Sequence, residues 1–474
     1  MLFNSIAFLV FLPIVFAAYW LITRNGKRWQ NAVLLAASYV FYGWWDWRFL
    51  LLLAFSTAID FLAGILLDRE RDDRRRRTLL WVTVALNLGL LAYFKYFGFF
   101  VDSAVRLLQT LGFQANPWSL NILLPIGISF YTFHGLSYVI DIYFRRIAPN
   151  RDPLTYAVFV CYFPLLVAGP IERATNLLPQ LDKARRFDYR LAIDGFRIMA
   201  WGFFKKLVIA DSMALEVNTL FENPESHGGG TLAIGVVYFA MQVYCDFSGY
   251  TDIARGVSRM FGIEVLDNFR TPYLSRSIPE FWSRWHISLS TWLNDYVFTP
   301  LAIEFRGWGK HGIFAAVFLT FVLSGLWHGP AWHFVAWGAL HGILYIPYVY
   351  RKKGLRSLSS RKDEPLSWKD IPAVLLTFAL VCLGYILFRS VNLDQAATYV
   401  MQILRNPFEV DPYYLKSIMN LLIPVSFLID WLSRKNYFTG RYGTGFLILE
   451  TMILAAITAA MGNFGSVEFI YFQF

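Results

Sequence analysis

Apolar runs of about 20 residues recur along this chain, and they constrain its fold more than any other feature. A run of that length crosses the hydrocarbon core of a bilayer as a helix. Only 16% of the residues are charged, whereas soluble domains carry about 25%. The sequence therefore predicts an all-α polytopic membrane protein, a helical bundle of about 11–12 transmembrane helices plus re-entrant and interfacial helices.

We expect one integral-membrane domain over residues 1–474. It would comprise N-terminal spans (1–150), a core with the motif-bearing and re-entrant segments (151–345), and C-terminal spans (346–474). The first run, up to Ile22, has no basic start and no small-residue cleavage site, so we expect an uncleaved span. Residues 156–170 are short and rich in proline and glycine, which predicts a broken or re-entrant segment.

Basic residues in the loops orient these spans. The chain carries 43 Lys and Arg against 33 Asp and Glu, a net charge of +10. Positive residues accumulate in cytoplasmic loops, so this excess indicates membrane orientation and not nucleic-acid binding. The basic loops 24–28 and 68–77 fall on the same side of a predicted helical hairpin, 31–67. We expect that side to be cytoplasmic and the N-terminus to lie outside.

The stretch 246–310 is polar, aromatic and basic, and we expect it on the cytoplasmic side. Asp246 and Asp252 flank an aromatic-glycine segment that predicts a turn, where carboxylates cap helix ends or pair with arginines as readily as they catalyse. After Pro279, large apolar residues recur at helical spacing and predict one amphipathic helix at the membrane interface. They are Trp282, Trp285, Leu289 and Trp292.

One ionisable side chain follows an uncharged apolar run. His328 comes after residues 313–323, and Gly329 and Pro330 follow it at once. Polar groups at membrane depth are costly and usually functional, and broken backbone is tolerated there only against protein or a wet cavity. The segment predicts a histidine that faces a cavity within the bilayer. The alternative is a histidine hydrogen-bonded between helices.

The sequence contains few other candidates for a catalytic or metal-binding motif. No phosphate-binding loop, dinucleotide fingerprint, HExxH pair or GxSxG elbow occurs, so nothing favours nucleotide hydrolysis, zinc proteolysis or serine hydrolysis. His328 and His333 are five residues apart, which is not the spacing of two ligands on one helical face. We therefore expect no metal site. We expect His341 to pack or hydrogen-bond between helices, and His227 to lie in a solvated loop.

Seven segments carry motifs of a known family. They are 124–131 (LPIGISFY), 168–173 (AGPIER), 245–254 (CDFSGYTDIA), 268–273 (NFRTPY), 281–293 (FWSRWHISLSTWL), 324–342 (from SGLWHG to ALHG) and 469–474 (FIYFQF). Together they span nearly the whole chain in order. The sequence resembles membrane-bound O-acyltransferases (MBOAT), in the bacterial branch that serves alginate O-acetylation and teichoic-acid D-alanylation.

This resemblance implies roles for individual residues. His328 matches the histidine that the family treats as catalytic, and His286 matches its second, auxiliary histidine. Four further positions are expected to bind substrate or line a tunnel: Asp246, Asn268, Trp285 and Trp327. One departure is at Asn294, where alginate members have an arginine, and a glycine pair after Pro300-Leu301 is missing too. This departure argues against alginate itself as the acceptor and does not affect the expected enzyme class.

The resemblance also implies a reaction. An acyl group, here acetyl, would pass from a cytoplasmic thioester to a hydroxyl for O-acetylation of an extracellular or periplasmic polysaccharide. The donor would be acetyl-CoA or an acyl-carrier thioester, with no further cofactor. A periplasmic or membrane-anchored acetyltransferase would be the partner, in the bacterial inner membrane among its lipids. The alternatives are D-alanyl transfer from a carrier-protein thioester and, in a different class, a polytopic transporter.

Overall fold

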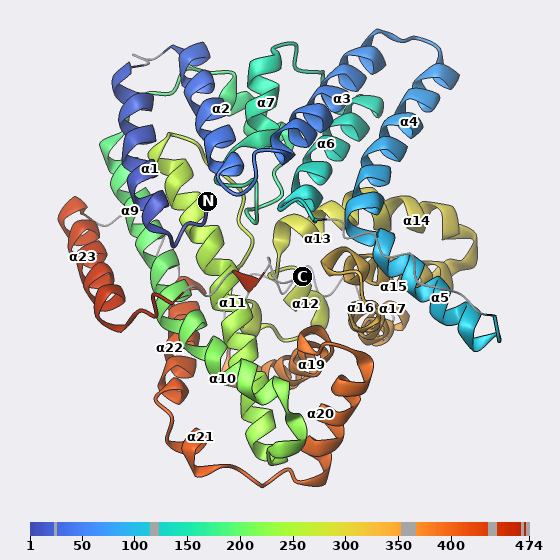
Figure 1. Ribbon diagram of the computed structural model, residues 1–474, viewed down its shortest axis with the longest axis vertical. Helices are drawn as coiled ribbons and strands as arrows, with labels where there is room; N and C mark the ends of the chain where they lie inside the picture. The colour runs from blue at the N-terminus through green and yellow to red at the C-terminus, as the bar shows by residue number, and fades with distance from the viewer. Residues whose placement is uncertain (23–25, 114–122, 352–365, 435–442, 466–468, 471–474) are drawn as a thin grey trace. The chain divides into compact units, whose positions relative to one another are not determined.

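Every regular element that the computed structural model describes is a helix (Figure 1). The described residues are 1–22, 26–113, 123–351, 366–434, 443–465 and 469–470. Six helical stretches among them are long and apolar enough to cross a membrane: Phe49–Arg69, Asp73–Thr110, Gly229–Met260, Ile287–His328, Trp368–Arg389 and Thr444–Met461. The prediction of an all-α polytopic membrane protein is confirmed. The total number of crossings stays a prediction.

Contacts within the chain divide it into two units, 1–199 with 253–266 and 200–252 with 267–474. Figure 1 shows α3, α4 and α6 of the first unit side by side. The helices of this unit are α1 (Ile6–Ala17), α2 (Lys27–Gly43), α3 (Phe49–Arg69), α4 (Asp73–Leu91), α5 (Phe97–Thr110), α6 (Ile128–Tyr143), α7 (Pro153–Cys161), α8 (Ala174–Leu181) and most of α9 (Tyr189–Phe203).

The first unit confirms two predictions from sequence. The hairpin is formed by α2 and α3, and Arg48 pairs with Asp46 in the turn between them. The predicted break near residue 160 is present as well, because α7 ends at Cys161 and irregular backbone follows. Side chains satisfy that backbone: Ser38 Oγ accepts from the N–H of Phe163, and His134 Nε2 accepts from the N–H of Glu172. Irregular backbone within a membrane protein needs such partners wherever it lies out of reach of water.

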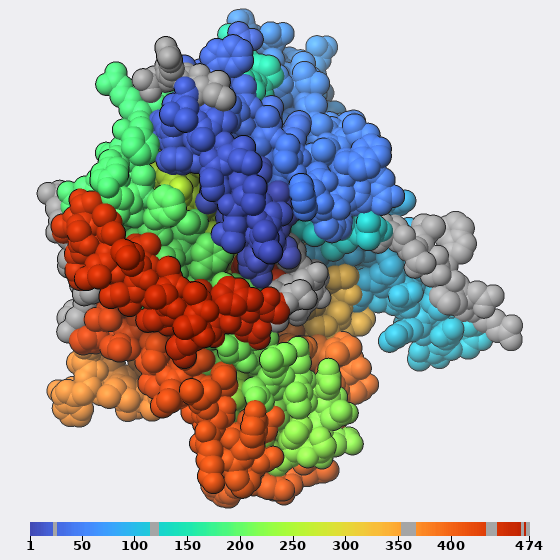
Figure 2. Space-filling model, turned by 60° about the vertical axis from the view of Figure 1, so that its left-hand side comes forward, coloured from blue at the N-terminus to red at the C-terminus, as the bar shows by residue number. Residues whose placement is uncertain are grey.

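The second unit holds the C-terminal helices. One of them, α23, lies at the surface, near the red end of the colour scale (Figure 2), and its exposed large apolar side chains are those expected of a lipid-facing helix. The unit contains α10 (Asp211–Glu222), α12 (Ile278–Trp282), α13 (Ile287–Leu293), α14 (Thr299–Glu304), α15 (Gly309–His328), α16 (Trp332–Leu344), α17 (Ile346–Tyr350), α19 (Ile371–Arg389), α20 (Leu393–Arg405), α21 (Pro412–Lys416), α22 (Met419–Arg434) and α23 (Thr444–Met461). The long helix α11 (Gly229–Met260) contributes residues to both units.

Two predictions for the stretch 246–310 are wrong. The expected turn at 246–252 is the interior of α11, where Gly249 lets the backbone of residues 202–206 approach closely. The expected single amphipathic helix after Pro279 is two short helices, α12 and α13. His286 between them takes a left-handed conformation with φ 43°, which a continuous helix does not allow. The four apolar residues that suggested an interfacial helix are all buried.

Glycines set the close packing of α15 against α16. A Cβ added at Gly325 would collide with the carbonyl oxygen of Phe334, and one added at Gly338 would collide with that of Phe321. Small residues at such positions let two helix backbones approach, which is the usual packing device in membranes. The hairpin therefore depends on glycine at both positions.

We predict that Gly325→Ala lowers the free energy of unfolding by about 1–3 kcal/mol, because the added methyl group meets fixed backbone. Thermal unfolding in detergent, followed by tryptophan fluorescence, measures the change. Gly89→Ala in α4 is the matched control, since a Cβ there has no heavy atom within 4 Å. Equal midpoints for Gly325→Ala and the wild type would contradict the packing described here.

Candidate active site

His328 is the last residue of α15 and is 8% exposed. The helix ends there because Gly329 adopts an extended backbone and Pro330 follows. The next helix, α16, begins at Trp332. The helix break predicted after His328 is confirmed, and it leaves the imidazole at the tip of the α15–α16 hairpin.

Aromatic rings from three helices surround this imidazole. The ring centroid of His328 lies 4.9 Å from that of Trp327, 5.1 Å from that of Trp337 on α16 and 5.2 Å from that of Phe388 on α19. All three rings meet the imidazole edge to face. Such a wall lowers the local dielectric constant, which strengthens any electrostatic interaction made inside it.

His286 is the second histidine of the site, with its ring centroid 6.5 Å from that of His328. It precedes α13 and is 1% exposed, with Phe247 edge to face at 4.7 Å and Trp327 at 5.9 Å. The structure thus brings together three of the residues singled out from sequence: His286, Trp327 and His328.

Asn268 holds the backbone on which His286 sits. Its carbonyl oxygen accepts from the N–H of Ile287 at 2.9 Å, and its side-chain oxygen accepts from Ser288 Oγ at 2.6 Å. Its amide group donates to Thr251 Oγ1 at 3.3 Å. A left-handed non-glycine residue costs about 1–3 kcal/mol and persists only where its surroundings fix it. These contacts support the conformation of His286.

Trp285 lies in a neighbouring aromatic cluster and not beside the two histidines. Within the part of the chain that the structure describes, its ring contacts are with Tyr244, Phe269, Tyr273, Phe281 and Tyr385. Its predicted place in a tunnel or substrate site stays a prediction.

Asp246 belongs to a buried ion cluster that sequence reasoning missed. Lys206 Nζ lies 2.5 Å from a carboxylate oxygen of Asp246 and 2.8 Å from one of Asp211, and all three side chains are almost fully buried. The other oxygen of Asp246 accepts from the N–H of Ile470 at 2.7 Å. Lys205, the preceding residue, pairs with Asp252 at 2.7 Å.

A π-helical segment, Phe204–Ala210, explains how consecutive lysines both reach α11. The ion cluster was detectable in the sequence, because Lys205 and Lys206 interrupt the apolar run 193–209. Charged residues in such a run usually have a buried partner or a function. Across the residues with described placement, no group of three or more His, Cys, Asp or Glu side chains is arranged to hold a metal ion.

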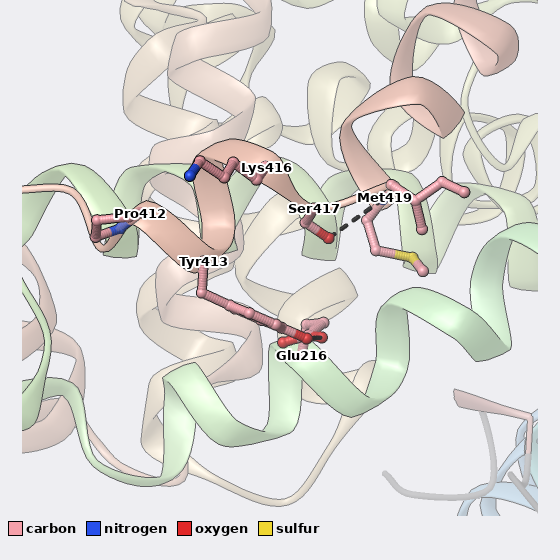
Figure 3. A pocket seen from close by; sticks show the side chains of 7 residues that line it. Glu216, Pro412, Tyr413, Lys416, Ser417 and Met419 are labelled. Atoms are coloured by element: carbon pink, nitrogen blue, oxygen red, sulfur yellow. Dashed lines mark hydrogen bonds between the residues drawn. The ribbon is translucent and has the colours of Figure 1, made fainter.

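The surface of the same unit has a separate cavity of about 490 Å³ between α10 and α21 (Figure 3). Tyr413 points toward Glu216 there and donates to its carboxylate at 2.7 Å. None of the seven residues that line this cavity is a histidine. The buried histidine pair is therefore the better candidate for acid-base chemistry.

Comparison with known proteins agrees with this geometry. Residues 147–362, which include both histidines, match the family model of the MBOAT, membrane-bound O-acyltransferase family. A probable alginate O-acetylase AlgI of Pseudomonas aeruginosa is 40% identical over 402 residues, which is 84% of this chain and 73% of that protein.

Two further relatives are less similar to this chain. A peptidoglycan O-acetyltransferase of Helicobacter pylori is 31% identical, over 84% of this chain and 78% of its own length. A teichoic acid D-alanyltransferase of Bacillus subtilis is 30% identical, over 56% of this chain and 69% of its own length.

The chain belongs to the membrane-bound O-acyltransferase family. It is an acyltransferase and a multi-pass membrane protein, so it uses an acyl donor in a membrane setting. The enzyme class predicted from the motifs is confirmed. The transporter alternative is not supported.

We predict that Lys206→Met destabilises the protein by about 3–5 kcal/mol, because two buried carboxylates then lose their cation. The yield of folded protein in detergent and its thermal midpoint measure this. Lys27→Met is the matched control. It removes the same cation from an exposed pair with Asp182, and exposed pairs contribute only about 0–1 kcal/mol. If both variants unfold alike, the buried cluster is not a stability element.

Proposed function

We propose that this acyltransferase moves an acetyl group from a thioester on the cytoplasmic side to a hydroxyl of a polysaccharide outside the cytoplasm. The observation that carries the proposal is His328, held at a helix break within an aromatic wall and 6.5 Å from a second histidine. The names of the two most extensively matched kinds of relative, alginate O-acetylase and peptidoglycan O-acetyltransferase, support both the acetyl group and the acceptor class.

His328 acts as the general base in this proposal. It takes the proton of the acceptor hydroxyl as that oxygen attacks the thioester carbonyl carbon. A carbon–oxygen bond forms, and the π electron pair moves to the carbonyl oxygen. On collapse the carbon–sulfur bond breaks, and the imidazolium returns its proton to the leaving thiolate. Imidazole suits this exchange because its ordinary pKa, about 6.5, lies close to working pH.

His286 has a supporting role. Its ring lies near that of His328, while Asn268 fixes its backbone. From there it can orient the thioester without exchanging a proton with it. A substitution at His286 should therefore cost less activity than one at His328.

The setting of the reaction completes the proposal. The excess of Lys and Arg in the predicted inner loops favours an anionic donor such as acetyl-CoA on that side of a bacterial inner membrane. An alginate-like exopolysaccharide is the first acceptor to test, with a periplasmic or membrane-anchored acetyltransferase as partner. D-alanyl transfer from a carrier-protein thioester is the alternative, favoured by the teichoic acid D-alanyltransferase relative over a smaller share of the chain.

We predict that His328→Ala inserts and folds normally but loses acyl transfer by about 10²–10⁴-fold, the usual contribution of a positioned acid-base group. Purified protein in proteoliposomes with radiolabelled acetyl-CoA measures transfer to acceptor. His286→Ala should lose less activity. His227→Ala, in the loop before α11, should match the wild type. Unchanged turnover in His328→Ala would refute the general base.

The donor is identified in the same system. Acetyl-CoA and a carrier-protein thioester are offered separately to the wild type. Transfer from acetyl-CoA supports O-acetylation, and transfer only from the carrier supports the D-alanyl alternative. Activity with neither donor would contradict the proposed function.

A further inference from the structure

The helical stretch that contains α4 and α5 is too long for a single membrane crossing. It runs over 38 residues, Asp73–Thr110. A helix rises about 1.5 Å per residue and the hydrocarbon core is about 30 Å thick, so about 20 residues cross it. The 19 residues of α4 are therefore enough for the crossing. The 14 residues of α5 must lie beyond the hydrocarbon core or along its edge.

The backbone changes direction between these two helices. A π-helical segment, Ala92–Tyr96, joins α4 to α5, and helices commonly bend at such segments. Figure 1 shows α5 running in a different direction from α4, and away from α3 and α6 of the same unit. In the described part of the chain, no residue of α5 is buried. The helix thus leaves the bundle of its own unit, and its surroundings must be something else.

One face of α5 is apolar. The residues on this face recur three or four positions apart, which places them on one side of a helix. They are Phe97, Phe100, Val101, Ala104, Leu107 and Leu108. Phe100 is 55% exposed and Leu107 is 61% exposed. Asp102, Arg106 and Gln109 lie on the opposite face. A helix divided in this way lies in the plane of a membrane interface, with its apolar face among acyl chains.

A cavity of about 470 Å³ lies on this face, where the helix bends. The rings of Tyr93 and Phe97 at its border have their centroids 6.2 Å apart. It is lined by Ala92, Tyr93, Phe97, Phe100, Val101 and Ala104, none of which is charged. A bound water needs two or more polar partners, and the phenol of Tyr93 is the single polar side-chain group in this lining. A hydrocarbon chain needs none and gains dispersion contacts there. The cavity therefore suits an acyl chain better than water.

The surface of α4 indicates that lipid, and not a second protein, covers this face. Trp81 and Leu88 are 59% and 45% exposed on a helix of crossing length, as expected of lipid-facing residues. Ala92 of the cavity follows Leu88 by four residues, and Leu88 follows Trp81 by seven, so all three lie on one helical face. The lipid-facing surface of α4 thus continues into the cavity and onto α5. Because the basic loop 68–77 before α4 is predicted to be cytoplasmic, α5 belongs to the outer side.

We propose that α5 is a lipid-binding helix that lies along the outer surface of the bilayer. Acyl chains of the outer leaflet cover its apolar face and fill the cavity beside Tyr93, while Asp102 and Arg106 lie among the lipid head groups. Tyr93 comes 20 residues after Asp73, which is about one hydrocarbon thickness along a helix. Aromatic residues are enriched at that depth, where they anchor a span at the interface. The helix thereby fixes the depth of the first unit in the membrane.

The test places a nitroxide spin label on Leu107→Cys or Gln109→Cys, two positions on opposite faces of α5. The full chain is reconstituted in vesicles of equal parts phosphatidylethanolamine and phosphatidylglycerol. Oxygen concentrates in hydrocarbon and a nickel chelate in water, so we expect a several-fold higher ratio of oxygen to nickel collision rates at Leu107→Cys. Leu86→Cys, on the exposed surface of α4, is the matched lipid-facing control. Labelled wild type gives the background of the three native cysteines, and thermal midpoints confirm folding.

Two other results would overturn the lipid-binding helix. Free access of the nickel chelate to both labels would show that α5 stands in water. Protection of the Leu107→Cys label from both oxygen and nickel would show that protein covers the apolar face, and dipolar broadening between labels would identify that protein as a second copy of the chain. Neither result concerns acyl transfer, so the proposed function is tested separately.

Discussion

A polar group that is buried in a membrane protein must find its partner within the chain, because lipid offers none. The structure meets this constraint repeatedly. Lys206 lies between two carboxylates, His134 accepts from the backbone of a broken segment, and Asn268 binds the backbone beside His286.

Helix ends, not helix faces, present the two histidines of the site. His328 ends α15 and His286 precedes α13, so neither imidazole is confined to one face of a regular helix. This explains why periodicity could not show that they meet. The glycines between α15 and α16 and the contacts of Asn268 fix the two ends. Rigid elements thus hold two residues at or beside breaks in the helices, as the positioning of catalytic groups requires.

Features that follow from local chemistry were predictable from the sequence. Apolar runs gave the helices, and Gly329-Pro330 gave the break after His328. Features that depend on tertiary contact were not. Gly249 suggested a turn, but its lack of a side chain serves close packing inside α11. The left-handed conformation of His286 leaves no mark in a helical pattern, so two short helices looked like one.

The environments of the histidines on α15 and α16 argue for a division of labour. His341 is committed through Nδ1 to Trp282, and His333 Nδ1 lies 3.1 Å from the carbonyl oxygen of Leu387. His286 and His341 are each 1% exposed, whereas His328 is 8% exposed. A general base must exchange its proton with a substrate that arrives from outside. His328 is more accessible than His286 and His341, which supports it as the base.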